Sequence, residues 1–164
     1  MSDQPTHEEA VRKVAELLKD QRIGMLTTVD PDGTFTSRPM AMQEVEFDGS
    51  LWFFAERTSR KVQQLAAHPQ VNVAVSAADS WISLNGTASV VPDTGKKAEL
   101  WNAAVDAWFP DGKSDPNIVL LRVDSDSAEY WDSPGGRIAS LFSFAKAKAT
   151  GKPYEGGENA KVDL

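Results

Sequence analysis

Short β-type segments separated by turn sequences fill most of the chain between residues 23 and 131, and this pattern constrains the fold most strongly. Asp30-Pro-Asp-Gly33 joins two of them in a sequence typical of a hairpin turn, and Asp48-Gly49 joins two more. The expected strands are residues 23–29, 34–42, 44–47, 50–56, 71–77, 81–91, 118–123 and 128–131. The periodicity itself indicates an α+β chain. A mainly β fold, with antiparallel strands closed or nearly closed into a barrel, is a further inference, because closure removes exposed strand edges.

Helical patterns flank and interrupt these strands. Apolar residues repeat at helical spacing over residues 7–20, and Thr6 with Glu9 three residues later forms a capping-box sequence. Further helices are expected at residues 59–67, 93–108 and 137–149. We expect one domain over residues 1–149. The remaining residues, 150–164, are rich in Gly, Lys and Glu and are expected to form a mobile C-terminal tail.

The charge and composition limit the classes of partner. The formal net charge is −7, which disfavours binding to nucleic acid or to an anionic membrane surface. No apolar stretch approaches the roughly 20 residues of a membrane-spanning helix. The first residues lack the basic-then-apolar pattern of a secretory signal, so a cytoplasmic protein is expected. The chain has no cysteine, which excludes disulfides and thiol catalysis.

Positive charge gathers where one strand runs directly into a helix. In the segment Leu51–Val62 an apolar strand is followed by Thr58-Ser59, either of which could cap the helix, with Arg57, Arg60 and Lys61 beside them. Arg38, on the preceding hairpin, could reach the same corner. A helix N-terminus with hydroxyl groups and cations is typical of a phosphate site. On spacing alone, such residues more often mark a solvated helix start than a ligand site.

Other reactive combinations are missing from the sequence. His7 and His68 have no partner at metal-ligand spacing, so no protein metal site is expected. No Ser/His/Asp arrangement and no glycine-rich dinucleotide loop can be recognised, so we predict no catalytic side chain and no resident nicotinamide cofactor.

Three segments in this order resemble a known family. They are Arg38-Pro-Met-Ala-Met42, Trp52-Phe-Phe-Ala-Glu-Arg-Thr-Ser-Arg-Lys61 and Glu129-Tyr-Trp-Asp-Ser-Pro-Gly-Gly-Arg137. Together they resemble the pyridoxamine 5′-phosphate oxidase family. The segments Trp81-Ile-Ser-Leu-Asn-Gly-Thr-Ala88, Leu100-Trp101 and Trp108-Phe-Pro-Asp-Gly112 are closer to its general stress protein 26 branch. The similarity spans about residues 8–140.

The resemblance implies a six-stranded antiparallel split barrel that binds FMN at the interface of a homodimer. By position, the FMN phosphate would be held by Arg38, Arg60 and Lys61, helped by Ser59 or Thr58. The segment Pro39-Met40-Ala41-Met42 would run beside the isoalloxazine ring, with main-chain N–H groups facing its polar edge, and Phe54 and Ala55 would touch the flavin. The partner subunit would contribute Trp81 or Ser83, and Trp131.

Two departures from the oxidase pattern bear on the reaction. Gln43 stands where the oxidases have a lysine, and Ile138-Ala-Ser-Leu141 replaces the segment that carries a histidine and a second arginine for the pyridoxal phosphate substrate. A site that neutralises a second phosphate would retain such groups, because an unpaired buried anion is costly. Pyridoxamine phosphate oxidase activity is therefore disfavoured.

The resulting hypothesis is an FMN-dependent oxidoreductase of the general stress protein type, of unknown substrate, in which the flavin carries the electrons and NADH or NADPH is a transient reductant. A flavin-binding protein without turnover, acting as a store, carrier or sensor, is an alternative. So is a split barrel that uses the deazaflavin F420 or haem, although the cationic corner disfavours haem.

Overall fold

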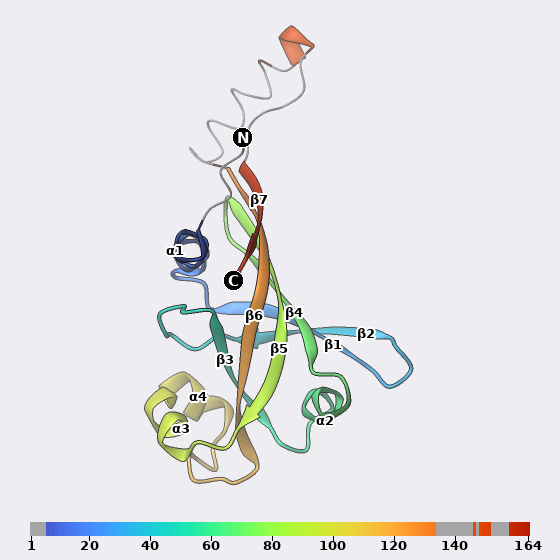
Figure 1. Cartoon of the computed structure of the whole chain (residues 1–164). Coiled ribbons are helices and arrows are strands. Elements are labelled where there is room, and N and C mark those ends of the chain that lie inside the picture. Colours follow the sequence, from blue (N-terminus) through green and yellow to red (C-terminus); the bar gives the residue numbers. More distant parts are fainter. Residues whose placement is uncertain (1–5, 134–145, 147, 152–157) are drawn as a thin grey trace.

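One antiparallel sheet organises the molecule (Figure 1). The computed structural model describes residues 6–133, 146, 148–151 and 158–164. The strands of this part of the chain are β1 (Ile23–Val29), β2 (Phe35–Ala41), β3 (Ser50–Glu56), β4 (Gln70–Ser76), β5 (Ser80–Val91), β6 (Ile118–Asp132) and β7 (Glu158–Asp163). The helices are α1 (His7–Leu18), α2 (Arg60–Ala67), α3 (Thr94–Leu100) and α4 (Ala103–Trp108). No helix in the described ranges is long and apolar enough to cross a membrane.

The strand order is β2-β1-β4-β5-β6-β3, with β7 added alongside β6. All paired strands are antiparallel. The two ends of this order approach each other just beyond β2, where the Gln43 N–H donates to the Trp52 carbonyl of β3 at 3.0 Å. The sheet therefore curls into a partly closed barrel, as expected for the split-barrel class. The expected strand count of six is wrong, since seven strands are present among the described residues.

The central strand β6 differs from its sequence-based description. Two strands were expected at residues 118–123 and 128–131, but a single strand of 15 residues runs through the polar stretch between them. A register shift at Asn85/Gly86 of β5 accommodates that stretch. A Cβ atom at Gly86 would lie 2.2 Å from the Asp124 carbonyl oxygen, so glycine permits the close approach of the two strands.

The second expected hairpin does not form. Residues 44–47 are not a strand, and β3 pairs with β6 instead of with them. Phe47 is buried in the core while Val45 is exposed, so the segment packs through one side chain and makes no strand ladder. The first hairpin is confirmed: the Gly33 N–H donates to the Asp30 carbonyl at 2.8 Å, and Gly33 has the positive φ of 86° that glycine tolerates.

The helices follow their sequence signals except at one break. The capping box of α1 is present, with the Glu9 N–H donating to Thr6 Oγ1 and the Thr6 N–H donating to Glu9 Oε2. The single helix expected over residues 93–108 is two helices. The first ends at Leu100, with the extended Trp101 as its C-cap. Asn102 caps the second, because its side-chain oxygen accepts from the N–H groups of Ala104 and Val105. The helix expected at 137–149 lies largely outside the described residues.

Two apolar clusters lie on either side of β3. Phe53 is fully buried in the main core, among residues of the other strands and of α1. Its neighbour Phe54 points the other way, into a smaller cluster with Leu100, Val105 and Leu120 beneath α3 and α4. The ring of Phe54 meets Trp101 edge to face, with centroids 5.4 Å apart. The alternation of side chains along β3 thus joins the barrel to the α3–α4 pair.

The C-terminal residues are not simply a mobile tail. Glu158–Asp163 form β7, which pairs with residues 127–132 of β6. Val162 is 4% exposed and belongs to the main core, and Leu164 packs against it. The alternation of Ala160, Val162 and Leu164 is the strand signal, which the surrounding charged and glycine residues obscured.

Substitution Val162→Ala is expected to lower the free energy of unfolding by about 1–2 kcal/mol, because two buried methyl groups are lost. Urea unfolding followed by tryptophan fluorescence measures the change. The control is Lys161→Ala on the exposed face of the same strand, which is expected to alter stability by less than about 0.5 kcal/mol. Equal, negligible effects of both substitutions would contradict the packing of β7 on the core.

Candidate functional site: a cationic corner and a separate aromatic hollow

The cationic corner forms where β3 leads into α2. Ser59 occupies the N-cap position of α2, but its side chain does not cap the helix. Instead, Ser59 Oγ donates to the Glu56 carbonyl at 2.6 Å, while Thr58 is exposed and its carbonyl accepts from Gln63 Nε2. Ser59 is thus the N-cap residue, as expected, but neither hydroxyl makes the expected capping hydrogen bond to the helix. The first N–H groups of α2 keep no side-chain partner from the cap, and the positive end of the helix dipole lies there.

Arg38 reaches this corner from β2. Its Nη1 donates to Thr28 Oγ1 at 2.7 Å and to the Leu26 carbonyl at 3.2 Å, and its Nη2 donates to Gln64 Oε1 at 3.3 Å. Burial, and then the nearby charge of Arg60, lower the pKa of the Arg38 guanidinium, while Asp30 opposes the shift. The expected convergence of Arg38 with the start of α2 is thus present in the structure.

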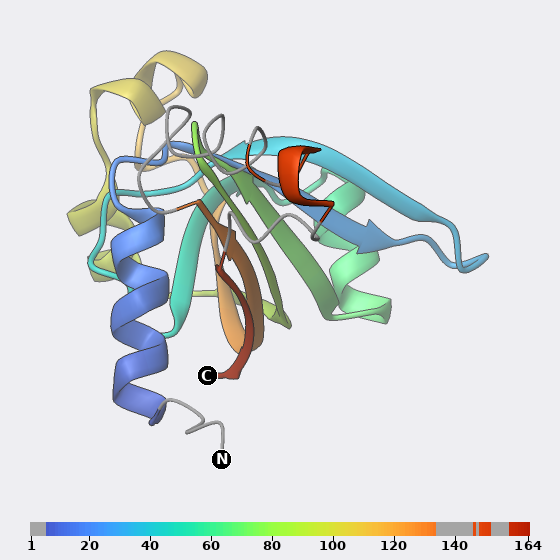
Figure 2. The ribbon, with the colours of Figure 1, turned by 90° about the horizontal axis from the view of Figure 1, so that it is seen from above.

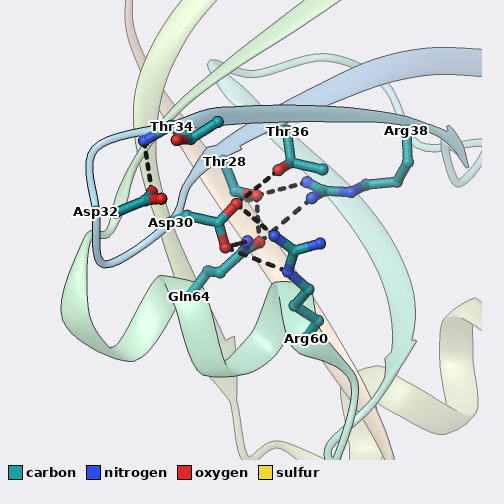
Figure 3. Close-up of polar contacts among 8 residues, drawn as sticks. All are labelled: Thr28, Asp30, Asp32, Thr34, Thr36, Arg38, Arg60 and Gln64. Atoms are coloured by element: carbon teal, nitrogen blue, oxygen red, sulfur yellow. Dashed lines mark hydrogen bonds and ion pairs between the residues drawn. The ribbon is translucent and has the colours of Figure 1, made fainter.

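Asp30 links the two arginines (Figure 3). Arg60 donates to both oxygens of its carboxylate, from Nη2 at 2.5 Å and from Nε at 3.2 Å. Gln64 Nε2 and Thr36 Oγ1 donate to the same carboxylate. Hydrogen bonds from Arg60, Gln64 and Thr36, in decreasing order of effect, lower the pKa of Asp30 to about 2.

Lys61 is the least engaged cation of the corner. It is partly buried, and burial followed by the charge of Arg38 lowers the pKa of its ammonium group, while Glu56 raises it. Among the described residues its Nζ has no hydrogen-bond or ion-pair partner. Arg38, Arg60 and Lys61 therefore bring three positive charges to the corner, where Asp30 is the only carboxylate of the described residues that bonds to any of them. Glu56 and Asp32 act on Lys61 and Arg60 through their charges without such a contact, and the remaining N–H donors of the three cations suit an anion.

Acid is expected to weaken the fold through Asp30. Its folded-state pKa of about 2 lies below the value of about 3.9 for an unfolded chain, so the stabilisation is fully present above pH ~4 and is lost as the pH falls towards 2. Thermal unfolding between pH 5 and pH 2 should show the wild-type protein and Asp30→Asn differing most at the upper end and converging at the lower. Asp111→Asn, at an exposed loop position, is the matched control. A constant difference between wild type and Asp30→Asn across this range would contradict the assignment.

Alternate residues of β2 face different sides of the sheet. Arg38 pairs with the buried Leu26, whereas Pro39 pairs with Met25 on the outer face. Met40 and Met42 are buried, and Ala41 is exposed. The Met42 N–H already donates to the Arg22 carbonyl at 2.9 Å. In the described chain β2 pairs with β1 alone, so its other edge carries main-chain groups without a strand partner.

Phe54 and Ala55 are placed inside the protein. Phe54 is 7% exposed and packs beneath α3 and α4, and Ala55 is 2% exposed in the main core. Both side chains are therefore largely shielded from solvent. Gln43, which replaces the lysine of the oxidases, accepts a hydrogen bond from Asn102 Nδ2 at 3.0 Å through its Oε1 and so ties the end of β2 to the α3–α4 pair. Residues 138–141, the other departure, lie outside the described residues.

A hollow of about 400 Å³ lies on the outer face of the sheet. Trp81 and Trp131, which are paired in adjacent strands, line it with Ser83, Ile23 and Met25. The two tryptophans are 48% and 41% exposed, so this face presents an unusual area of uncovered aromatic surface. Ser83 Oγ accepts from Asn72 Nδ2 at 2.8 Å.

The corner and the hollow are separate within one chain. The sheet stands between them, because the Arg38 side chain lies on its inner face and the hollow lies on its outer face. Figure 2 shows α2 beneath the β1–β2 hairpin, which extends away from the rest of the sheet. The structure thus brings together Arg38, Arg60, Lys61 and Ser59, and separately Trp81, Ser83 and Trp131.

Four polar residues of the corner do not follow from the sequence patterns: Thr28, Asp30, Thr36 and Gln64. The pattern around Asp30 predicts only a turn. Gln64 lies four residues after Arg60, so both fall on one face of α2, and that spacing was the signal available. Gln64 is 4% exposed, and a buried amide needs hydrogen-bond partners.

Known proteins share this fold. The chain is 28% identical over 158 residues to the protein bli-3 of Neurospora crassa, and this alignment covers 89% of this chain and 76% of that protein. A structure from Jannaschia sp. CCS1 that carries the general stress protein 26 name superposes with a TM-score of 0.77 at 29% identity, covering 93% of this chain and 97% of the other. The general stress FMN/FAD binding protein of Xanthomonas citri superposes with a TM-score of 0.65 at 34% identity, covering 76% of this chain and 89% of the other.

The family model described as pyridoxamine 5′-phosphate oxidase like matches residues 9–155. This range holds the whole barrel except β7, together with the cationic corner and the aromatic hollow. The chain therefore belongs to the pyridoxamine 5′-phosphate oxidase-like family, on its general stress protein 26 branch.

Proposed function

We propose that this protein binds FMN through its phosphate at the cationic corner and acts as an FMN-dependent oxidoreductase. The observation that carries the proposal is the convergence of Arg38, Arg60 and Lys61 at the N-terminus of α2, where Lys61 has no hydrogen-bond or ion-pair partner in the described chain. Such a donor set fits a phosphate group, which needs several N–H donors and compensating positive charge. The FMN/FAD binding description of the Xanthomonas citri relative supports a flavin as the ligand.

The aromatic hollow supports a homodimer with the flavin between subunits. Ile23, Met25, Trp81 and Trp131 form one uncovered apolar face, and a second copy would bury it. Since the corner and the hollow cannot meet within one chain, a flavin held at the corner would reach Trp81, Ser83 or Trp131 of a partner chain. The edge of β2, with Pro39 and Ala41, would lie between the two.

The bound flavin would supply hydride transfer, while the residues of this chain bind and shield it. The described residues that line the hollow carry no titratable side chain, and the proposal assigns no general base to this chain. Gln43, which stands where the oxidases have a lysine, is uncharged and bonded to Asn102. Its presence argues against a second phosphate site of the oxidase kind. A single domain and a cytoplasmic location are parts of the same proposal.

The test is an absorbance spectrum of the purified protein, with FMN titrated into the flavin-free form and NADH or NADPH then added without oxygen. Saturable binding followed by bleaching of the flavin band supports the oxidoreductase, and light scattering of the loaded protein should give a dimer. Binding without bleaching by either nucleotide favours a store, carrier or sensor. Absence of FMN binding overturns the proposal and directs the same titration to F420.

A further inference from the structure

Asp30 occupies an unexpected position for an anion site. A carboxylate beside three cations reduces their attraction for a phosphate, so electrostatics by itself would disfavour it. Its side chain is only 11% exposed, and it accepts four hydrogen bonds, from Arg60, Gln64 and Thr36. The Asp30 carboxylate is therefore held in place at the centre of the corner's hydrogen-bond network.

The first contact of Asp30 fixes the direction of Arg60. The Arg60 side chain is 69% exposed and would otherwise be free to turn into solvent. The two-point contact through Nε and Nη2 holds the guanidinium plane against β1, towards Arg38 (Figure 3). A guanidinium group has five N–H donors, so this contact leaves several of them for an anion.

The second contact acts on Arg38 through Gln64. An amide can be turned over, which exchanges its oxygen and its NH₂ group. Because Gln64 Nε2 donates to Asp30, its Oε1 faces Thr28 and Arg38 and accepts from both. With the amide reversed, the NH₂ group would face the Arg38 donors. Asp30 thus sets the orientation of the second arginine through one intermediate side chain.

We propose that Asp30 is the positioning residue of the phosphate corner: it holds Arg60 directly and Arg38 through Gln64 in the orientation that receives the anion. This inference rests on the proposed binding of FMN through its phosphate. It makes a prediction opposite in sign to that of simple electrostatics, since removing the negative charge of Asp30 is expected to weaken the binding of a phosphate ligand.

The test compares the affinities of the full-length protein for FMN and for riboflavin, which lacks the phosphate. The ratio of the two dissociation constants isolates the contribution of the corner from that of the ring. In Asp30→Asn the preference for FMN is expected to fall by more than about tenfold, with riboflavin affinity unchanged. The matched control is Asp32→Asn, which removes the same charge from the same hairpin without touching Arg60 or Gln64 and is expected to keep the preference.

The outcomes separate this inference from the proposed function. A wild-type protein that binds FMN no more tightly than riboflavin overturns the phosphate corner, and the role of Asp30 with it. A wild-type preference that persists or increases in Asp30→Asn overturns the role of Asp30 alone. If Asp30→Asn does not fold, Thr36→Val decides the question, because it takes one hydrogen bond from Asp30 and leaves all charges in place. It is expected to reduce the preference roughly two- to tenfold, and an unchanged ratio overturns the inference.

Discussion

Replacing Lys61 with alanine is expected to weaken FMN binding by roughly 10- to 150-fold, or about 1.5–3 kcal/mol, and to leave riboflavin binding unchanged. Lys61 is partly buried beside Arg38, and no neighbouring group in the described chain forms a hydrogen bond or an ion pair with its ammonium. Removing the side chain therefore breaks no internal contact of that kind. The loss of FMN affinity then measures the contact between Lys61 and the ligand. Fluorescence quenching of the flavin during titration measures both affinities.

The control for this prediction is Lys113→Ala, which removes one positive charge from an exposed position in the loop before β6. It should leave both affinities unchanged at moderate salt, because exposed charges beyond about 10 Å are screened. If Lys61→Ala and Lys113→Ala behave alike, or if riboflavin binding falls as much as FMN binding, Lys61 does not contact the phosphate.

Replacing Phe53 with alanine is expected to lower the free energy of unfolding by about 3–5 kcal/mol. Phe53 is fully buried, and it is the largest of the side chains that are less than 2% exposed. Its removal takes away the transfer free energy of the ring and leaves a cavity that the surrounding strands cannot fill. Urea unfolding measures the loss of stability, and the dependence of the unfolding free energy on urea concentration is compared between the variants.

The control is Phe35→Ala, because Phe35 is 74% exposed near the tip of the β1–β2 hairpin. Its removal is expected to change stability by less than about 0.5 kcal/mol. A loss below about 1 kcal/mol for Phe53→Ala would mean that the core between β3 and the other strands is not packed as the structure has it.

Local signals in the sequence were sufficient for the elements that depend on near neighbours. The first hairpin follows from Asp30-Pro-Asp-Gly33, the start of α1 from Thr6 and Glu9, and the bounds of β1 from its apolar pattern. Arg60 and Lys61 of the corner were also visible, because β3 leads directly into the helix that carries them. Arg38 was expected there from the preceding hairpin, although β3 separates its strand from α2 in the chain.

The same local signals failed where the outcome depended on distant partners. Residues 44–47 and Asp48-Gly49 resemble a hairpin, yet β3 finds its partner in β6, about 70 residues away. Residues 158–163 form a strand because they pair with β6 and because Val162 packs into the main core. Both partners lie far away in the chain. Pairing across such distances is set by burial on one face of the sheet, which a sequence window does not contain.

The sequence by itself therefore determined the type of each long element, the family and the concentration of positive charge at the corner. Only the tertiary structure decided which residues of that corner hydrogen-bond to one another, because Asp30 and Gln64 lie 34 residues apart and meet through the packing of α2 against β1. It also decided that the corner and the tryptophan-lined hollow lie on opposite sides of the sheet, since strand register fixes the side to which each residue points.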